Sequence, residues 1–380
     1  MSQSDGTVLG ATKIVDNGDD MYRWNLVITG DGFTAAEMPA FQTVVDDFVA
    51  YMQTVSPFSA AATWADVNIH RLDVESDESG ADNPNCDGTT VDTYFDAEFC
   101  VGGLDRTLVV NELIVMVEAN AHVPEWDALL VFVNDTTYGG AARSGVAAAS
   151  LDPASHEIAM HEMGHAAFEL ADEYPTFAGC GTGEAGHDVY PVATDGEPVE
   201  ANVTANTDRA TLKWGDLVDP ATAIPTTSNA DCTNCDTQFS PVPFGTVGLF
   251  EGARYFHCGC FRPEFDCRMN NLGQPFCAVC RAEIANELTW QTLFDPSPCF
   301  VAGAVYGDAQ HLDVATLRRW RDVRLARGGR GARLLSAGYE VAGPRLARLV
   351  GSRPRVAGGL RRGLFAPLAL ALRRRPGALG

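Results

Sequence analysis

One pentapeptide has the residue types and the spacing of a metal site. His161-Glu162-Met163-Gly164-His165 is an HExxH pattern. Residues four apart on an α-helix lie on the same face, about one turn apart along the axis. On a helix, the two imidazoles can therefore bind a single Zn²⁺, for which histidine is a common ligand. Glu162 adjoins the first histidine, where its carboxylate would reach a zinc-activated water and act as the general base.

The residues that follow extend this motif to HEMGHAAFELADEY, which resembles the HExxH…DEY signature of the IgA-peptidase family of zinc metallopeptidases. The resemblance covers roughly residues 24 to 287. It implies an α/β, zincin-like metallopeptidase domain with a mixed sheet and an active-site helix, acting on a protein or peptide. Further segments are similar to that family in the same order along the chain: 25–33, 57–58, 79–84, 133–140, 248–253, 261–263 and 267–280.

The resemblance assigns the third zinc ligand to Asp172, the aspartate of the DEY triplet. On a straight helix, Asp172 would lie about 10 Å beyond His165, too far to share one ion. The helix must therefore end near residues 168–170 and fold back. Glu173 is the nearest alternative ligand. We expect it instead to hydrogen-bond to a ligating side chain or to hold the turn.

Two further alternatives lie later in the chain, Glu184, as in a gluzincin-type peptidase, and His187. The sequence also departs from the family, whose members usually carry glycine between the second histidine and the DEY. Here Phe168 and Glu169 occupy that stretch, so the turn must form without glycine, at a steric cost if φ is positive.

The family is grouped with the metzincins, in which a methionine on a tight turn lies beneath the zinc. Met269 matches that methionine, and it would provide an apolar, polarizable floor against the ligand imidazoles. An oxyanion donor is also required, and Tyr174, Tyr190 and Tyr255 are the candidates. We expect the substrate peptide to lie extended against an edge strand near residues 138–150.

Composition and charge limit the class of protein. The chain has 380 residues, 46% of them hydrophobic, and a formal net charge of −23. No apolar run is long enough for a transmembrane helix. Sixteen arginines fall in residues 316–380, which leaves a strongly acidic body. We therefore predict a catalytic domain over residues 1–300 and a poorly ordered Arg-rich tail over residues 301–380.

The acidic body argues against nucleic acid as a partner and suits a secreted or cell-surface protein, although the first ten residues lack the pattern of a signal peptide. Eleven cysteines indicate either disulfides or thiolate zinc sites. Their irregular spacing favours disulfides, in a loop-heavy C-terminal half. We expect Cys86 to pair with Cys100, and the cysteines from Cys258 to Cys280 to crosslink around Met269. The acidic loop 76–87 could hold Ca²⁺, but a solvated loop is the favoured interpretation.

Hydrophobic periodicity places the main elements around the motif. Asp152 and Pro153 should begin the motif helix as N-cap and first helical residue, and His156 and Glu157 should be polar decoration of its first turn. A buried central strand is expected at 128–133. The other expected elements are strands at 24–29, 67–74 and 144–150, helices at 34–54, 104–119 and 282–293, and loops from 174 to about 243.

Together these features predict a secreted zinc-dependent endopeptidase with Glu162 as general base and His161, His165 and Asp172 as zinc ligands. The alternative is a surface or binding protein that keeps the zinc for structure alone. An intact Glu162 argues against that alternative, because a structural zinc site does not need this carboxylate.

Overall fold

The computed structural model describes residues 5–20, 23–175, 189–232 and 239–292, with short stretches at 305–306, 313–314, 316–319 and 360–368. The chain forms two compact units, Met1–Thr292 and Leu293–Gly380. In the second unit, a π-helix covers Arg361–Phe365. Most of the Arg-rich tail lies outside the described residues, and the division after residue 300 stays a prediction. None of the described helices is long and apolar enough to cross a membrane.

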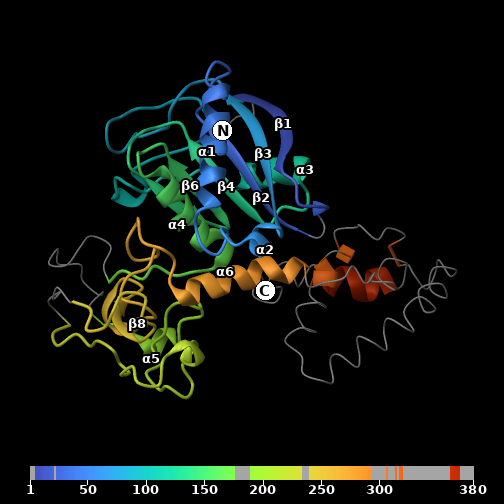
Figure 1. The fold of residues 1–380 in the computed structure, drawn as a ribbon. Helices are drawn as coiled ribbons and strands as arrows, with labels where there is room; N and C mark the ends of the chain where they lie inside the picture. Colours follow the sequence, from blue (N-terminus) through green and yellow to red (C-terminus); the bar gives the residue numbers. More distant parts are fainter. Residues whose placement is uncertain are drawn as a thin grey trace. The chain divides into compact units, whose positions relative to one another are not determined.

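A six-stranded sheet organises the first unit. Its strands are Gly6–Val15 (β1), Trp24–Asp31 (β2), Val67–Ser76 (β3), Ala128–Val133 (β4), Gly140–Arg143 (β5) and Val146–Ser150 (β6). They lie in the order β1-β3-β2-β4-β6-β5 (Figure 1). The four inner strands, β3, β2, β4 and β6, are parallel to one another, whereas β1 and β5 pair antiparallel at the two edges. The α/β class and the mixed sheet are confirmed.

The inner strands form where apolar runs can be buried on both faces. Every residue of β2 and of β4 is buried, as expected for inner parallel strands. The expected strands at 24–29, 67–74 and 128–133 are confirmed. The chain's first strand, β1, was missed, because it is half exposed and lacks an apolar run. The strand expected at 144–150 is not an edge strand, since β5 pairs with β6 on its outer side.

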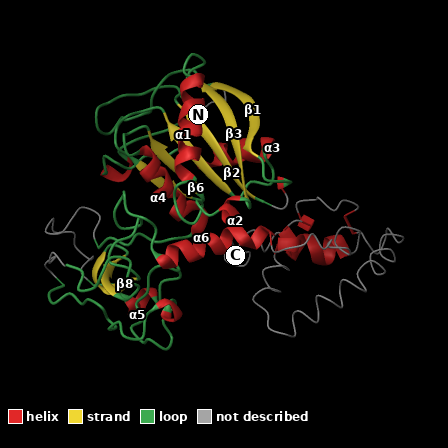
Figure 2. Ribbon diagram, in the orientation of Figure 1, coloured by secondary structure: helices red, strands yellow, loops and turns green. Residues whose placement is uncertain are grey.

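Helices cover both faces of the sheet (Figure 2). The longer helices of this region are Met38–Met52 (α1), Glu112–His122 (α3) and Ser155–Phe168 (α4). Alternate residues of β2, β4 and β6 pack with α1 and α4 in one core, and the intervening residues pack with α3 in another. The helix expected at 104–119 begins only at Glu112, where the Asn111 side chain accepts a hydrogen bond from the Ile114 amide.

Irregular chain dominates the second half of the first unit, as predicted. Its short elements are Val192–Asp195 (α5), Gly215–Leu217 (η3), Phe250–Ala253 (β7) and Phe256–Arg262 (β8), the last two forming a hairpin. Ala61–Trp64 (α2) and Val101–Gly103 (η2) are the short elements of the first half. The unit ends with Ala278–Thr292 (α6), which begins four residues earlier than the helix expected at 282–293.

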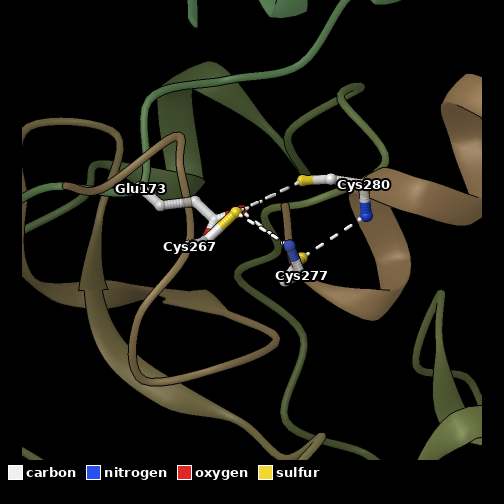
Figure 3. A group of neighbouring side chains, drawn as sticks. All are labelled: Glu173, Cys267, Cys277 and Cys280. Atoms are coloured by element: carbon white, nitrogen blue, oxygen red, sulfur yellow. Dashed lines mark hydrogen bonds between the residues drawn. The ribbon is translucent and has the colours of Figure 1, made fainter. Parts of the chain in front are cut away.

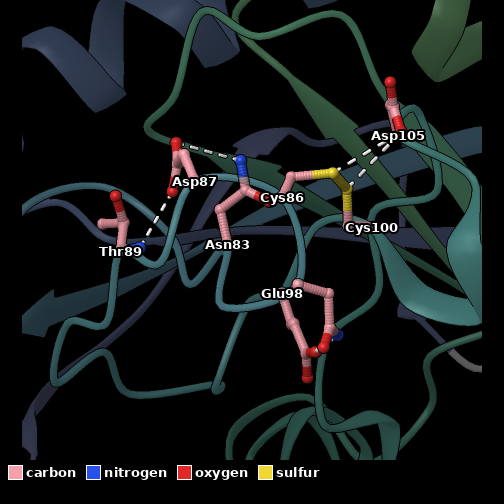
Figure 4. Close-up of a disulfide and its surroundings, with 8 residues drawn as sticks. Asn83, Cys86, Asp87, Thr89, Glu98, Cys100 and Asp105 are labelled. Carbon is pink, nitrogen blue, oxygen red and sulfur yellow. Dashed lines mark hydrogen bonds between the residues drawn. A yellow bond between two sulfur atoms is a disulfide. The ribbon is translucent and has the colours of Figure 1, made fainter.

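Two disulfides lie within the described residues, and one of them was predicted. Cys86 pairs with Cys100, beside the carboxylate of Asp105 (Figure 4). Cys258 pairs with Cys232 rather than with a cysteine near Met269. The expected crosslinks around Met269 are therefore wrong. Four buried cysteines are unpaired, namely Cys260, Cys267, Cys277 and Cys280.

Candidate metal centre

Helix α4 carries the HExxH residues toward a cavity. The helix begins at Ser155 with Ala154 as its N-cap, so the predicted N-cap at Asp152 is wrong. Asp152 instead holds the preceding turn, where its side chain accepts a hydrogen bond from the Ala154 amide at 2.8 Å. The helical spacing nevertheless brings the two Nε2 atoms of His161 and His165 to 3.2 Å from each other.

The helix ends at Phe168, within the predicted range, and the chain then reverses. Glu169 has a φ of 51°, in the left-handed region, and the amide of Leu170 donates to the carbonyl of Gly164 at 3.0 Å. These are features of a helix C-terminus that usually carries glycine. A residue with a Cβ atom adopts this conformation at a cost of about 1–2 kcal/mol. The turn without glycine thus exists, and it returns the chain toward the histidines.

The reversal brings Asp172 against both imidazoles. Its Oδ1 atom lies 3.1 Å from Nε2 of His161 and 3.2 Å from Nε2 of His165. All three side chains are buried or half-buried, and the three atoms lie within 4.8 Å of one another. Oδ1 of Asp172 has no hydrogen-bond partner. Three candidate ligand atoms from a twelve-residue segment therefore converge on one point.

The hydrogen bonds made by the two Nδ1 atoms explain why this arrangement fits a cation. Nδ1 of His161 donates to the carbonyl of Arg268 at 3.0 Å, and Nδ1 of His165 donates to the carbonyl of Leu170 at 2.6 Å. Because a carbonyl only accepts, each Nδ1 carries the hydrogen and each neutral imidazole presents a lone pair at Nε2. Three acceptors then face one another, which is repulsive unless a positive charge lies between them.

The electrostatics of the histidines indicate the same preference. Burial alone would lower the pKa of His165, but the carboxylate of Asp172 raises that pKa to about 9. The pKa of His161 is also raised, by the same carboxylate and against its burial. The site therefore attracts a proton when no metal is present, and a divalent cation satisfies the same three atoms.

Met269 packs beneath the helix between the two histidines. It is fully buried, and a Cβ added to Gly164 would meet the Met269 sulfur at 2.6 Å. Only glycine at position 164 allows this approach. The role of Met269 as a floor beneath a zinc ion stays a prediction.

Glu157 fixes the segment that carries Met269, so its interpretation as polar decoration is wrong. Its carboxylate forms an ion pair with Arg268 at 3.0 Å and accepts a hydrogen bond from the Gly273 amide at 3.1 Å. The hydroxyl of Tyr51 also donates to it. Burial and this carboxylate raise the pKa of Tyr51 to about 12, which keeps the hydroxyl protonated.

A cavity of about 490 Å³ opens beside the three converging side chains. Glu162 lines it together with Tyr138, Tyr174 and Arg106. Burial raises the pKa of the Glu162 carboxyl above its usual value. Gly140, the first residue of the edge strand β5, also lines the cavity. Arg106 carries no sequence signal, because it lies in an irregular segment far from the motif.

The structure separates the three candidate tyrosines. Tyr174 lines the cavity, and its hydroxyl interacts with Asp172 and Arg106. The hydroxyl of Tyr255 donates to Oδ2 of Asp172, the oxygen that faces away from the histidines. Tyr190 lies apart, where its hydroxyl donates to the carbonyl of Gly196 at 3.1 Å.

The structure tests only some of the alternatives to Asp172 as the third ligand. Glu173 is fully buried but does not support the histidines, which are backed by two backbone carbonyls instead. It holds the turn through its amide, which donates to the carbonyl of Met269 at 2.7 Å. Glu184 and His187 lie outside the described residues. Within the described residues, no carboxylate of the acidic loop 76–87 belongs to a converging metal-ligand group.

The sequence matches the family described as IgA peptidase M64 over residues 12–241 and 236–288. The match includes α4, the segment with Asp172 and the segment with Met269. No curated protein matches the chain. Because the matched residues make up well over half of the sequence, the chain belongs to the IgA peptidase M64 family.

Proposed function

We propose that this peptidase is a secreted, zinc-dependent endopeptidase in which His161, His165 and Asp172 hold the zinc and Glu162 is the general base. The observation that carries the proposal is the convergence of three acceptor atoms at 3.1–3.2 Å with no donor between them. Two imidazoles and one carboxylate are a common protein ligand set for catalytic zinc. When bound, zinc would supply Lewis acidity that polarises the scissile carbonyl and acidifies water.

Glu162 is suited to move the proton. It lines the cavity next to His161, and burial raises the pKa of its carboxyl above the usual value, which makes it a stronger base than an exposed glutamate. A base of this kind takes the proton of the attacking water and delivers it to the nitrogen of the leaving amine. No other carboxylate lines the cavity among the described residues.

Tyr174 is the best placed oxyanion donor of the three tyrosines. It lines the cavity, and burial and the nearby Asp172 carboxylate raise the pKa of its hydroxyl. The hydroxyl therefore stays protonated at neutral pH and can donate to an oxygen that gains negative charge. The guanidinium of Arg106, which also lines the cavity, adds a positive charge to the site.

The edge strand β5 supports an extended substrate. It is the last strand of the sheet, and its first residue lines the cavity. An edge strand offers unpaired backbone groups that can pair with a peptide running beside it. Substrate side chains would then alternate toward and away from the cavity, which allows the loops around it to select the sequence that is cut.

Two properties support a location outside the cytosol. The structure contains disulfides Cys86–Cys100 and Cys232–Cys258, and such bonds persist mainly in oxidising compartments. The acidic composition agrees with this location.

Casein hydrolysis by the full chain tests the function. We expect cleavage that stops when a chelator removes the metal and returns when zinc is added at low concentration. N-terminal sequencing of the products would show internal cuts, as for an endopeptidase. If the protein binds zinc but cleaves neither casein nor any protein in a mixture of substrates, the result would instead support the structural-zinc alternative.

A further inference from the structure

A second group of potential metal ligands lies near the candidate metal centre. Glu173 follows Asp172, Cys267 precedes Met269 by two residues, and Cys277 and Cys280 lie at the start of α6. All four side chains are buried, and their ligand atoms lie within 4.8 Å of one another. Figure 3 shows the carboxylate and the sulfurs pointing toward a common centre.

The distances within this group match a tetrahedral zinc site. Two sulfurs bound to one zinc at 2.3 Å lie about 3.8 Å apart, and a sulfur and a carboxylate oxygen lie about 3.5 Å apart. Here the sulfurs of Cys267 and Cys280 are 3.7 Å apart. Oε1 of Glu173 lies 3.3 Å from the sulfur of Cys280 and 3.8 Å from that of Cys277.

Backbone amides and a buried guanidinium face these ligands, although burial raises the pKa values of Glu173, Cys277 and Cys280 and only that of Cys267 is lowered. The amide of Cys277 donates to the sulfur of Cys267 at 3.2 Å, and the amide of Cys280 donates to the sulfur of Cys277 at 3.4 Å. Cys277 and Cys280 also lie at the N-terminus of the fifteen-residue helix α6, where the helix dipole is positive. The buried guanidinium of Arg262 interacts electrostatically with Glu173 and Cys267.

A disulfide accounts for these observations less well. A disulfide needs sulfurs about 2.0 Å apart, whereas Cys267 and Cys280 are 3.7 Å apart. Joining any two of the three cysteines would leave the third as a buried thiol. It would also leave Oε2 of Glu173 buried without a bonded partner, since the Asn202 amide donates only to Oε1, at 2.9 Å. Buried carboxylates are ordinarily paired or bound to a metal.

We propose that Glu173, Cys267, Cys277 and Cys280 bind a second metal ion, and that this ion is a structural Zn²⁺. Thiolates favour zinc over hard cations such as Ca²⁺ and Mg²⁺. Four protein ligands close the coordination sphere and leave no position for a substrate. The ion joins the segment of Asp172 to the segment of Met269, and both to helix α6. The proposal does not depend on the proposed catalytic function.

Metal counting on the full chain, purified under reducing conditions, tests the second site. We expect two zinc ions per wild-type chain by mass spectrometry of the metal. One should remain after the double substitution His161→Ala/His165→Ala, and one after Cys277→Ser/Cys280→Ser. Cys260→Ser is the matched control, because Cys260 is buried and unpaired but lies outside the group. It should keep both ions.

Cobalt substitution identifies the ligands even if the cysteine variant fails to fold. The His161→Ala/His165→Ala protein loaded with Co²⁺ should show sulfur-to-cobalt charge transfer in the near ultraviolet and intense visible bands of a tetrahedral site. Glu173→Gln should shift the visible bands and weaken cobalt binding. If the His161→Ala/His165→Ala protein holds no zinc, or if its cobalt spectrum lacks sulfur bands, the proposal is overturned. A Cys267–Cys280 disulfide in the peptide map of the native protein would also overturn it.

Discussion

The amide of Glu173 donates a hydrogen bond to the carbonyl of Met269 at 2.7 Å. On one side of this bond, Asp172 precedes Glu173 and faces the two histidines. On the other side, Arg268 precedes Met269, and its carbonyl accepts the hydrogen bond from Nδ1 of His161. This bond therefore ties the candidate third ligand to the segment that orients the first.

Replacing Glu162 with glutamine should abolish hydrolysis without removing metal. The amide keeps the shape of the side chain but cannot accept the proton, and loss of a general base costs on the order of 10²–10⁴ in rate. Steady-state kinetics on a peptide found in the casein digest, with metal analysis of the same sample, would measure both effects. Wild-type turnover by the purified variant would show that Glu162 is not the base.

Substitutions around Asp172 should lower zinc affinity in a graded way. Tyr255→Phe removes the hydroxyl that donates to Oδ2 of Asp172, and loss of such a partner typically costs about 10–100-fold in metal affinity. Asp172→Ala removes the ligand itself and should cost more. Tyr190→Phe is the control, since its hydroxyl donates to Gly196 instead.

Competition with a zinc chelator, followed by recovery of activity, would give these affinities. If Asp172→Ala regains activity at the same free zinc concentration as the wild type, the third ligand must be another residue. Glu184 and His187 would then be the next residues to substitute.

Glu169→Gly should stabilise the protein. Glu169 is exposed and has a positive φ at the end of α4, a conformation that glycine adopts without a Cβ clash. The free energy of unfolding should rise by about 0.5–1 kcal/mol, because relief of the clash exceeds the added entropy of the unfolded chain. Glu169→Ala is the control, since it removes the same charge but keeps the Cβ atom. Equal urea unfolding curves for the two variants would contradict a backbone origin.

Glu157→Ala should destabilise the segment around Met269. The substitution leaves the buried Arg268 without its carboxylate partner and removes the acceptor for the Tyr51 hydroxyl and the Gly273 amide. Leaving such groups unsatisfied costs about 1–3 kcal/mol.

The ion pair between Arg143 and Glu112 provides the control for that substitution. Its atoms are 3.6 Å apart and the arginine is 56% exposed, so Glu112→Ala should cost at most about 1 kcal/mol. Chemical unfolding of both variants would measure the two losses in free energy of unfolding. Similar losses in the two would mean that Glu157 does not fix the segment.

Truncation after residue 300 should leave activity and thermal stability nearly unchanged. The removed residues carry most of the arginines, whereas the first compact unit ends at Thr292. Calorimetry and the casein assay on the shortened chain would measure the effect. A large drop in melting temperature would assign part of the folding core to the tail.

Local spacing explains which parts of the site the sequence could predict. Four residues separate His161 from His165, and helix geometry alone places them together. The short return to Asp172 follows from the distance that one ion allows. Arg106 and Tyr255 come from segments about 55 and 94 residues from His161, with no periodic pattern to relate them. Only the packing of the whole unit brings them to the site.

The cysteines show where spacing is ambiguous. Cys277 and Cys280 stand three apart, which suits a thiolate metal site as well as a disulfide. The Cys86–Cys100 disulfide was predicted correctly, but the crosslinks expected around Met269 were not, because Cys258 pairs with Cys232, 26 residues earlier, and Cys267, Cys277 and Cys280 are unpaired. Similarly, the sequence did not predict β1, because this strand is stabilised by pairing with β3 and has no hydrophobic pattern of its own.

The hydrogen bond from His161 to Arg268 spans 107 residues of sequence. During synthesis, the candidate ligands His161, His165 and Asp172 leave the ribosome long before Arg268 and Met269. Until those residues follow, the nascent chain lacks the acceptor that orients the first histidine and the floor beneath the helix. The candidate metal centre must therefore be completed late, when nearly the whole first unit is available to fold. A chain released before Arg268 would carry the HExxH motif without the residues that orient His161, and we expect it not to cleave nearby proteins.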